Sequence, residues 1–305
     1  MYDIIIVGGG TAGMTAALYA LRNGKSVLVV EKNGFGGQIT HSPKVENYPG
    51  IPSMSGNEFA EHLLDQIMAQ GAEIEYGNVT RIEDTENGRS VSTEEGDTFN
   101  GRAVILATGV RHRMLGLEGE EELVGEGISF CAVCDGDFYA DKPVCVAGGG
   151  NSALQEAVLL SEICSGVTIL QDLPFLTGEQ RLQDTLREKK NVRILTGVRI
   201  TDLNKSGKSL IGVTVSHTET GIDELVPCDG LFVAVGLIPE NDAFAHLADL
   251  DAIGYFDADE RCQTKTPGIY VAGDCRQKGI RQLTTAAADG ATAALAACRY
   301  LNNLT

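Results

Sequence analysis

The fold is decided by the first residues of the chain, which read Tyr2-Asp3-Ile4-Ile5-Ile6-Val7-Gly8-Gly9-Gly10-Thr11-Ala12-Gly13. The apolar run predicts a buried strand that leads directly into a glycine-rich turn. An alanine-rich stretch of helical character, Met14 to Asn23, follows, and then a second apolar strand, Ser26 to Val30. Glu31 ends that strand, 23 residues beyond Gly8. Strand, glycine loop, helix, strand and acid together predict a dinucleotide-binding βαβ unit.

Each part of this pattern has a physical role in holding a dinucleotide. Glycines permit the tight turn and the close approach of the backbone, and the pyrophosphate lies at the N-terminus of the helix. The carboxylate accepts hydrogen bonds from ribose hydroxyls. Glycine-rich turns also serve the ordinary packing of helix on strand, but here every element of the context is present. We therefore predict cofactor contacts at Gly8, Gly10, Thr11, Ala12, Gly13 and Glu31.

Length and composition are typical of an enzyme with two domains. The chain has 305 residues, 43% of them hydrophobic, and this length exceeds what one core usually organises. The sequence contains no run of 18 apolar residues, so we expect no transmembrane helix. The first strand begins at residue 2, which leaves no room for a signal peptide. We therefore expect a cytoplasmic protein.

The chain is strongly acidic, with a net charge of -18 at pH 7 and a pI of about 4.6. The acidic excess is largest in the middle, where Gly116 to Asp242 has 9 Lys and Arg against 21 Asp and Glu. Such a charge favours solubility and argues against nucleic acid or an anionic membrane as a partner.

The dinucleotide pattern occurs a second time in the middle of the chain. A predicted strand, Pro143 to Ala147, leads into Gly148-Gly149-Gly150-Asn151-Ser152-Ala153. A predicted helix, Leu154 to Glu162, and a strand, Val167 to Leu170, complete the repeat. The chain therefore contains two units of the same kind.

Two linkers bound the middle unit, one from Leu115 to Glu120 and one from Gly236 to Glu240. After the second linker the chain reaches Gly268 to Asp274 and a long alanine-rich helix, about Thr284 to Leu301. We predict an α/β fold of two Rossmann-like three-layer domains, the second inserted into the first. Residues 1–115 plus 243–305 form the outer domain, and residues 116–242 form the inserted one.

A cysteine pair, Cys131-Ala132-Val133-Cys134, lies between the two glycine loops, and Asp135 follows it. Zinc would need two further Cys or His ligands at suitable spacing. The other six cysteines form no second closely spaced pair, and no two of the five histidines are adjacent, so we predict no metal site. The spacing indicates a redox pair, in which one thiol attacks a disulfide and the other resolves the mixed species. Asp135 would relay protons or cap a helix.

Seven motifs in the same order resemble the low-molecular-weight thioredoxin reductase family of flavoproteins, over essentially the whole chain. They are the first glycine loop, Gly36-Gly37-Gln38, Asn47-Tyr48-Pro49-Gly50, Ala107-Thr108-Gly109, Cys131-Ala132-Val133-Cys134-Asp135-Gly136, Gly273-Asp274 and Arg281-Gln282. The resemblance implies FAD in the outer domain, a redox-active disulfide in the inserted domain, a homodimer, and a thioredoxin-like protein as substrate. It adds flavin contacts at Gly37, Gln38, Asn47, Thr108, Gly109, Gly273, Asp274, Arg281 and Gln282.

The resemblance also implies a role for each residue of the cysteine motif. Cys134 is the thiol nearer the flavin, Cys131 attacks the partner disulfide, and Asp135 acts as general acid and base. A disulfide packed against a flavin cannot also meet a protein substrate. The inserted domain is therefore expected to rotate about the linkers near Gly116 and Gly236.

The second glycine loop lacks the cations that bind NADPH. In NADPH-dependent relatives a His-Arg-Arg-x-x-x-Arg segment holds the 2'-phosphate, whereas this chain has Gln171-Asp172-Leu173-Pro174-Phe175-Leu176-Thr177. Loss of these charge-assisted contacts, each worth about 1.5 to 3 kcal/mol, should weaken NADPH binding by several factors of ten. The chain thus resembles the ferredoxin-linked, pyridine-nucleotide-independent branch of the family, and we favour reduced ferredoxin as the electron donor.

Other donors and other classes of function stay open. NADH would use Gln171 or Asp172 to accept from the free ribose hydroxyls, and NADPH would need unrelated contacts. A flavin dithiol oxidase or a non-catalytic redox sensor would share the motifs. An acidic ferredoxin would need a local basic face, for which the candidates are Arg111, His112, Arg113, Arg276 and Lys278.

Overall fold

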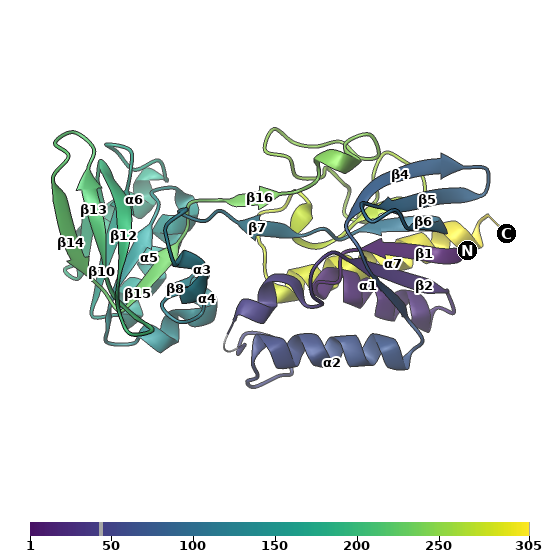
Figure 1. The fold of residues 1–305 in the computed structure, drawn as a ribbon, viewed down its shortest axis with the longest axis horizontal. Helices are drawn as coiled ribbons and strands as arrows, with labels where there is room; N and C mark the ends of the chain where they lie inside the picture. The colour runs from purple at the N-terminus through teal and green to yellow at the C-terminus, as the bar shows by residue number, and fades with distance from the viewer. Residues whose placement is uncertain (43–44, 305) are drawn as a thin grey trace. The chain divides into compact units, whose positions relative to one another are not determined.

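The computed structural model of the chain describes residues 1–42 and 45–304, which form two compact units (Figure 1). Unit 1 consists of residues 1–40, 45–111 and 238–304, and unit 2 consists of residues 41–42 and 112–237. The middle of the chain is therefore inserted into the outer part. The boundaries lie four and five residues before those predicted from the sequence, at 111 instead of 115 and at 237 instead of 242.

Unit 1 is built on one sheet with the strand order β3-β2-β1-β6-β5-β4, in which β17 also pairs with β6. β1 pairs in parallel with both β2 and β6, as the βαβ pattern requires. β4 and β5 add an antiparallel extension that the sequence analysis did not identify. The strands are β1 Tyr2–Val7, β2 Val27–Glu31, β3 Glu73–Tyr76, β4 Val79–Thr85, β5 Gly88–Thr93, β6 Thr98–Leu106 and β17 Ile269–Val271.

Two apolar cores lie on the two faces of this sheet. One packs the sheet against helices α1 and α7, and the other packs it against the residues of η3 and the chain that follows. Strands buried on both faces explain why β1 and β2 read as continuous apolar runs. The helices of unit 1 are α1 Thr11–Arg22, α2 Gly56–Ala69 and α7 Leu283–Asn302, with 3-10 turns η1 Gly37–His41, η3 Asp242–Phe244 and η4 Gly273–Cys275.

Unit 2 contains a fully parallel sheet with the strand order β11-β10-β9-β15-β8. Its strands are β8 Ile128–Ser129, β9 Pro143–Ala147, β10 Gly166–Gln171, β11 Val192–Thr196 and β15 Gly230–Val233. A three-stranded antiparallel sheet packs on one face, formed by β12 Val198–Ser206, β13 Ser209–His217 and β14 Asp223–Pro227. Helices cover the other face. They are α5 Asn151–Ile163 and α6 Gln180–Glu188, with the shorter α3 Glu120–Leu123, α4 Ala132–Asp135 and η2 Gly136–Tyr139 elsewhere in the unit.

The topology confirms the predicted α/β fold with two Rossmann-like units, the second inserted into the first. The helices after the two glycine loops begin three residues earlier than predicted, at Thr11 and Asn151. Each has a glycine N-cap with extended backbone, Gly10 or Gly150, so the last residues of each loop form the first helical turn. The predictions count these residues as part of the glycine loops and therefore begin both helices too late.

The two units are linked by β7 Val110–His112 and β16 Leu237–Pro239, which pair with each other as a two-stranded sheet (Figure 1). The predicted hinge near Gly116 lies outside these strands. Glu120 is only 2% exposed, and its carboxylate accepts backbone N–H bonds from Leu115, Gly116 and Leu117 at 2.8 to 3.2 Å. Residues 115–117 are therefore held within unit 2 by a buried carboxylate, and the sequence could not show this contact.

Candidate active site

The first glycine loop leaves no space for side chains where it passes the neighbouring strand and helix. Gly8 has a φ of +108°, and a Cβ there would lie 2.3 Å from the carbonyl oxygen of Ala107. A Cβ on Gly13 would lie 1.9 Å from the carbonyl oxygen of Gly8. Around Gly10, in contrast, the nearest atom to such a Cβ is 3.8 Å away. The backbone at the start of α1 is thus open to a pyrophosphate.

Glu31 is held rigidly beside this loop. One carboxylate oxygen accepts the backbone N–H of Gly9 at 2.6 Å, and the other accepts that of Asn33 at 2.8 Å. The residue is only 8% exposed. The structure shows that Glu31 fixes the loop, while its predicted hydrogen bond to a ribose stays a prediction.

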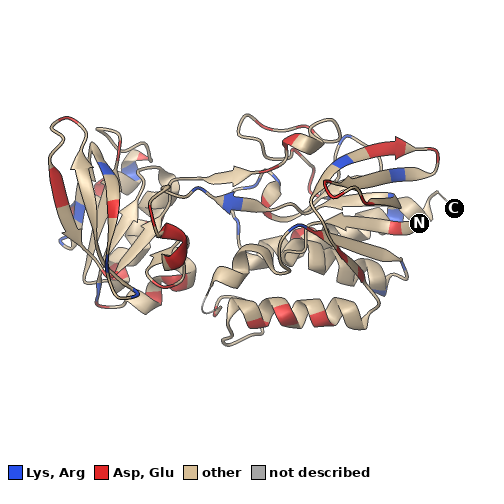
Figure 2. Cartoon of the chain, viewed as in Figure 1, with Lys and Arg blue, Asp and Glu red and all other residues tan. Residues whose placement is uncertain are grey.

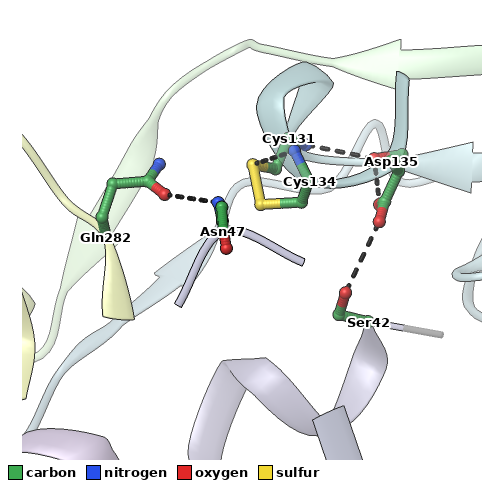
Figure 3. The surroundings of a disulfide bond; sticks show 7 residues. Ser42, Asn47, Cys131, Cys134, Asp135 and Gln282 are labelled. Atoms are coloured by element: carbon green, nitrogen blue, oxygen red, sulfur yellow. Dashed lines mark hydrogen bonds between the residues drawn. A yellow bond between two sulfur atoms is a disulfide. The ribbon is translucent and has the colours of Figure 1, made fainter. Parts of the chain in front are cut away.

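Two of the predicted flavin contacts from distant parts of the chain touch each other. Asn47 donates from Nδ2 to Oε1 of Gln282 at 3.2 Å, which joins the Asn47–Gly50 motif to the N-cap of α7 (Figure 3). Gly37 and Gln38 form the start of η1 and are exposed. Thr108 donates to the buried Asn241, and nothing lies within 4 Å of the place where a Cβ of Gly109 would be.

The Gly273-Asp274 motif forms a turn whose residues are mostly buried. Gly273 has a φ of +83°. Burial raises the pKa of Asp274, and Lys278, whose Nζ is 3.1 Å from Oδ1, opposes that shift. Arg281 donates to the Asp274 carbonyl at 3.2 Å, and its guanidinium lies 4.1 Å from the ring centre of Tyr255. Tyr255 is a residue that the sequence analysis missed, since it is 26 residues from Arg281 and belongs to no recognised motif.

The residues of unit 1 fit FAD on the chemistry of their donors and on the shape of the loop. A cradle that only glycine can form leads into the N-terminus of α1, where the helix dipole favours a pyrophosphate. Asp274 has the carboxylate that a polyol chain would hydrogen-bond. The partial positive charge at the start of α7, after Gln282, would stabilise an anionic reduced ring.

In unit 2 the cysteine pair forms a disulfide at the start of α4 (Figure 3). Cys131 is the N-cap of this helix, and the backbone N–H of Cys134 donates to its sulfur at 3.2 Å. A backbone N–H directed at a sulfur stabilises negative charge there once the bond is reduced. The geometry therefore favours Cys131 as the thiolate that attacks. The six free cysteines are all buried, as expected for small apolar side chains.

Asp135 lies next to the disulfide and is only 9% exposed. Burial raises the pKa of its carboxyl, and hydrogen bonds from Ser129 at 2.6 Å and Ser42 at 3.5 Å oppose the rise. Ser129, on β8, also accepts the backbone N–H of Cys131 at 3.1 Å. It therefore connects the acid to the cysteine pair. The sequence analysis missed Ser129, because a serine before a cysteine motif has no signature of its own.

We expect a Ser129→Ala variant to shift the pH profile of turnover. The Ser129 hydrogen bond favours the charged carboxylate, so its loss should raise the pKa of Asp135 further and move the alkaline limb of kcat to higher pH. The value of kcat should fall about 3- to 10-fold, because one hydrogen bond is lost at the site. Steady-state rates from pH 5 to about 9 check this expectation. An unchanged pH profile of kcat would mean that the ionisation of Asp135 does not cause its alkaline limb.

The second glycine loop resembles the first at its first two glycines, whereas Ala153 stands where the first loop has Gly13. Gly148 has a φ of +122°, and a Cβ there would lie 2.6 Å from the carbonyl oxygen of Ala234. Gln171, which is buried, lies over Gly149 as Glu31 lies over Gly9. The three positions that carry arginine in NADPH-dependent relatives are Asp172, Leu173 and Thr177, and all three are exposed. The backbone of a nucleotide-binding loop is thus present, but its three arginine positions have no cation for a 2'-phosphate.

Most of the residues considered for a basic docking face are already engaged within their own unit. Arg111 pairs with Glu240 at 2.9 Å, and Arg276 pairs with Asp289 at 3.0 Å. The Lys278 side chain is only 9% exposed. Burial lowers the pKa of His112 to about 4, so this residue is neutral at pH 7. Figure 2 shows basic residues scattered among more numerous acidic ones. None of these four residues is therefore a free positive charge, and the basic face stays a prediction.

Within residues 1–42 and 45–304, no three or more His, Cys, Asp or Glu side chains are grouped as metal ligands. No helix in the described part of the chain is both long and apolar enough to span a bilayer.

Comparison with known proteins agrees with this site. Residues 2–290 match the family model described as pyridine nucleotide-disulphide oxidoreductase. The chain is 40% identical to the thioredoxin reductase of Listeria monocytogenes over 304 residues, which covers 100% of this chain and 95% of that one. It is 36% identical to the thioredoxin reductase of Bacillus subtilis, with 100% and 96% covered. The crystal structure of thioredoxin reductase from Streptococcus pyogenes superposes with a TM-score of 0.93 at 36% identity, covering 99% of both chains.

A family model over nearly the whole length and full-length relatives thus agree with two Rossmann-like units and a disulfide at a helix start. FAD is the cofactor of this group of enzymes. The chain belongs to the pyridine nucleotide-disulphide oxidoreductases and, among these flavoproteins, to the low-molecular-weight thioredoxin reductase family.

Proposed function

We propose that the chain is an FAD-dependent reductase of thioredoxin-like protein disulfides that works through Cys131 and Cys134. The observation that carries this proposal is the disulfide at the start of α4, with a backbone N–H on the Cys131 sulfur and the buried Asp135 beside it. A structural disulfide has no need of a neighbouring buried acid, whereas thiol–disulfide exchange needs both a stabilised thiolate and a proton donor.

The exchange with the partner follows from the two thiols. The Cys131 thiol loses its proton and attacks a sulfur of the partner disulfide, so that a mixed disulfide forms and the departing partner thiolate takes up that proton. Cys134 then attacks the Cys131 sulfur, which reforms the Cys131–Cys134 bond and releases the second partner thiol. The two enzyme thiols are oxidised, the partner disulfide is reduced, and both protons pass to the partner.

Recovery of the dithiol needs two electrons and two protons. FAD, when bound, supplies the two electrons that open the Cys131–Cys134 bond. Asp135 supplies one of the two protons, because burial favours its protonated form and the Ser129 hydrogen bond holds its carboxyl in place, and solvent supplies the other. We propose that the cofactor is held by the first glycine loop with Glu31, and by the Asn47, Thr108-Gly109, Asp274 and Arg281-Gln282 segments.

We propose that unit 2 rotates during the cycle, because the disulfide has to meet the cofactor and the protein partner in turn. Glycines flank the paired links β7 and β16, with φ of +67° at Gly109 and +114° at Gly236. Glu120 holds residues 115–117 inside unit 2, so the backbone angles that change during the rotation are those of β7, β16 and the glycines beside them. Different small-angle scattering curves for the oxidised and the reduced enzyme would support the rotation, and identical curves would contradict it.

We propose that the electron donor is not NADPH, with reduced ferredoxin as the first candidate. The support is the exposed, cation-free segment at Asp172, Leu173 and Thr177. Arg111, Arg276 and Lys278 are paired with carboxylates of their own unit and add no support, so this proposal depends on the missing arginines alone. NADH is the second candidate, because the second glycine loop keeps its geometry and Gln171 lies where Glu31 lies in unit 1.

Anaerobic titration with three donors tests this assignment. We expect NADPH and NADH at millimolar concentration to leave the visible flavin band of the enzyme nearly intact, while reduced ferredoxin bleaches it. Rapid bleaching by NADPH would contradict the proposal, and rapid bleaching by NADH alone would select the second candidate. Asp172→Arg combined with Leu173→Arg should raise the rate of flavin reduction by NADPH about 10-fold or more if the loop lacks only its cations.

We further propose that the enzyme is a cytoplasmic homodimer, as the family resemblance implies. A reducing compartment suits six unpaired thiols. Equilibrium sedimentation should give twice the chain mass of 32.3 kDa, and a mass of one chain would reject the dimer.

A further inference from the structure

Four charged side chains of unit 1 form a cluster, which consists of Asp274, Arg276, Lys278 and Asp289. Asp289 is only 9% exposed although it is in the middle of α7. Arg276 and Lys278, between η4 and α7, complete the cluster with Asp274. Charges in a protein interior are costly to desolvate unless they are paired and hydrogen-bonded. The hydrogen bonds of each charged side chain therefore indicate which parts of the chain the cluster holds together.

The Asp289 carboxylate binds three residues of one loop. Its Oδ2 accepts the backbone N–H of Gly273 at 3.1 Å, and Nζ of Lys278 donates to the same oxygen at 3.2 Å. Arg276 donates to Oδ1 at 3.0 Å and to Oδ2 at 3.3 Å. One carboxylate on α7 thus fixes the main chain of the Gly273-Asp274 motif and the two cations that follow it.

The same turn of α7 touches the first glycine loop. Gly290 follows Asp289, and a Cβ there would lie 2.2 Å from the carbonyl oxygen of Ala12. A Cβ on Gly273 would lie 2.6 Å from the Cβ of Ala12. Because Ala12 is in the first turn of α1, the start of that helix, the turn at Gly273 and the middle of α7 meet at one point.

We propose that Asp289 is a positioning residue for the flavin, because it holds the Gly273-Asp274 turn against the start of α1 so that both form one binding surface. The inference rests on FAD as the cofactor and adds a residue that none of the seven sequence motifs contains. Asp289 acts through the loop: its oxygens are occupied by Gly273, Arg276 and Lys278.

The charge of Asp289 matters as well as its hydrogen bonds. The cluster contains two cations and two carboxylates, and Lys278 is shared between them, at 3.1 Å from Asp274 and 3.2 Å from Asp289. Without the second carboxylate, both cations would have only Asp274 as counter-ion. Asp274 would then be drawn away from the cofactor, so the loss of one charge at Asp289 disturbs a different residue at the flavin surface.

An Asp289→Asn variant tests this inference. We expect the Kd for FAD, measured from free flavin fluorescence on dilution of the holoenzyme, to rise about 10- to 100-fold, since charge-assisted bonds are lost at the loop. The visible flavin band of the remaining holoenzyme should shift or lose its fine structure. Asp289→Asn combined with Lys278→Met should bind FAD more tightly than Asp289→Asn alone, because one of the two cations that share Asp274 as counter-ion is gone.

Asp3→Asn is the matched control. Asp3 is also a carboxylate of unit 1 that accepts a backbone N–H, from Ser26, and pairs with an arginine, Arg102 at 3.4 Å. Asp3 lies at the start of β1, whereas the first glycine loop follows the end of this strand. Loss of the Asp3 charge should therefore lower the melting temperature without changing the Kd for FAD. Equal Kd changes in both variants, or no change in Asp289→Asn, would overturn the inference.

A single variant, Lys278→Met, keeps the test decisive if Asp289→Asn fails to fold. It removes one donor of the network and should raise the Kd for FAD about 3- to 10-fold with a change in the visible band. An unchanged Kd and band in Lys278→Met would also overturn the inference. Turnover with thioredoxin is not part of either readout, so failure of the proposed substrate leaves this test intact.

Discussion

Replacement of Cys134 by serine is expected to lower turnover of a thioredoxin disulfide by at least about 10³-fold. Cys131 keeps its thiol in this variant and keeps the backbone N–H that stabilises its charge. It should therefore still attack the partner disulfide. A serine hydroxyl cannot then attack the Cys131 sulfur, so the mixed disulfide should accumulate.

The measurement is a steady-state rate together with mass spectrometry of the trapped product. The partner should be found covalently attached to Cys131 in Cys134→Ser and free in Cys131→Ser, since only the first variant keeps the attacking thiol. Cys164→Ala is the matched control, because Cys164 is a buried free cysteine of the same unit. Its turnover should equal that of the unmodified enzyme. Retained turnover in Cys134→Ser would reject the disulfide mechanism.

Replacement of Asp135 by asparagine is expected to lower kcat about 10²- to 10⁴-fold, the usual contribution of a general acid or base. Burial raises the pKa of this carboxyl in the folded chain, so the native state binds more protons than the unfolded state at pH values above the ordinary value for aspartate. Stability is therefore lost as the pH rises through the raised pKa, because the carboxylate must ionise where it is poorly hydrated. An asparagine does not ionise, so the variant should be more stable than the parent near neutral pH.

A fall in kcat together with a rise in stability in Asp135→Asn would distinguish a catalytic acid from a structural one. Urea denaturation at pH 5 and pH 8 measures the free energy of unfolding, and the gain in Asp135→Asn should be larger at pH 8. Asp137→Asn, two residues on and exposed, should change neither quantity. Turnover within about threefold of the parent, or a loss of stability at pH 8, would contradict the role given to Asp135.

The sequence predicted the parts of the site that are consecutive in the chain. A glycine loop, a helix start and a closely spaced cysteine pair are local patterns whose geometry follows from neighbouring residues. The two βαβ units and the redox pair could therefore be identified directly, and both are present in the fold. The antiparallel extensions β4–β5 and β12–β14 were not predicted. In β4 and β12 exposed and buried positions follow each other irregularly, so these two strands lack a clean alternation.

The sequence did not predict the environments of the charged side chains. The sequence shows Arg276 and Lys278 as basic residues near a turn, and they were considered for a docking face. In the fold a carboxylate on α7 neutralises them, and it lies 13 and 11 residues further along the chain. The contact of the buried Glu120 carboxylate with the Gly116 backbone could not be read from the sequence for the same reason.

By itself, the sequence determined that the chain has two Rossmann-like units, one inserted into the other, with a redox pair in the second. Only the tertiary structure decided that Ser129 joins Asp135 to Cys131, that Asp289 binds the turn at Gly273, and that the positions of the missing arginines are exposed. The physical reason is that backbone conformation follows from neighbouring residues. A hydrogen-bond partner, a counter-ion and a shift in pKa depend on side chains that packing brings together from distant positions.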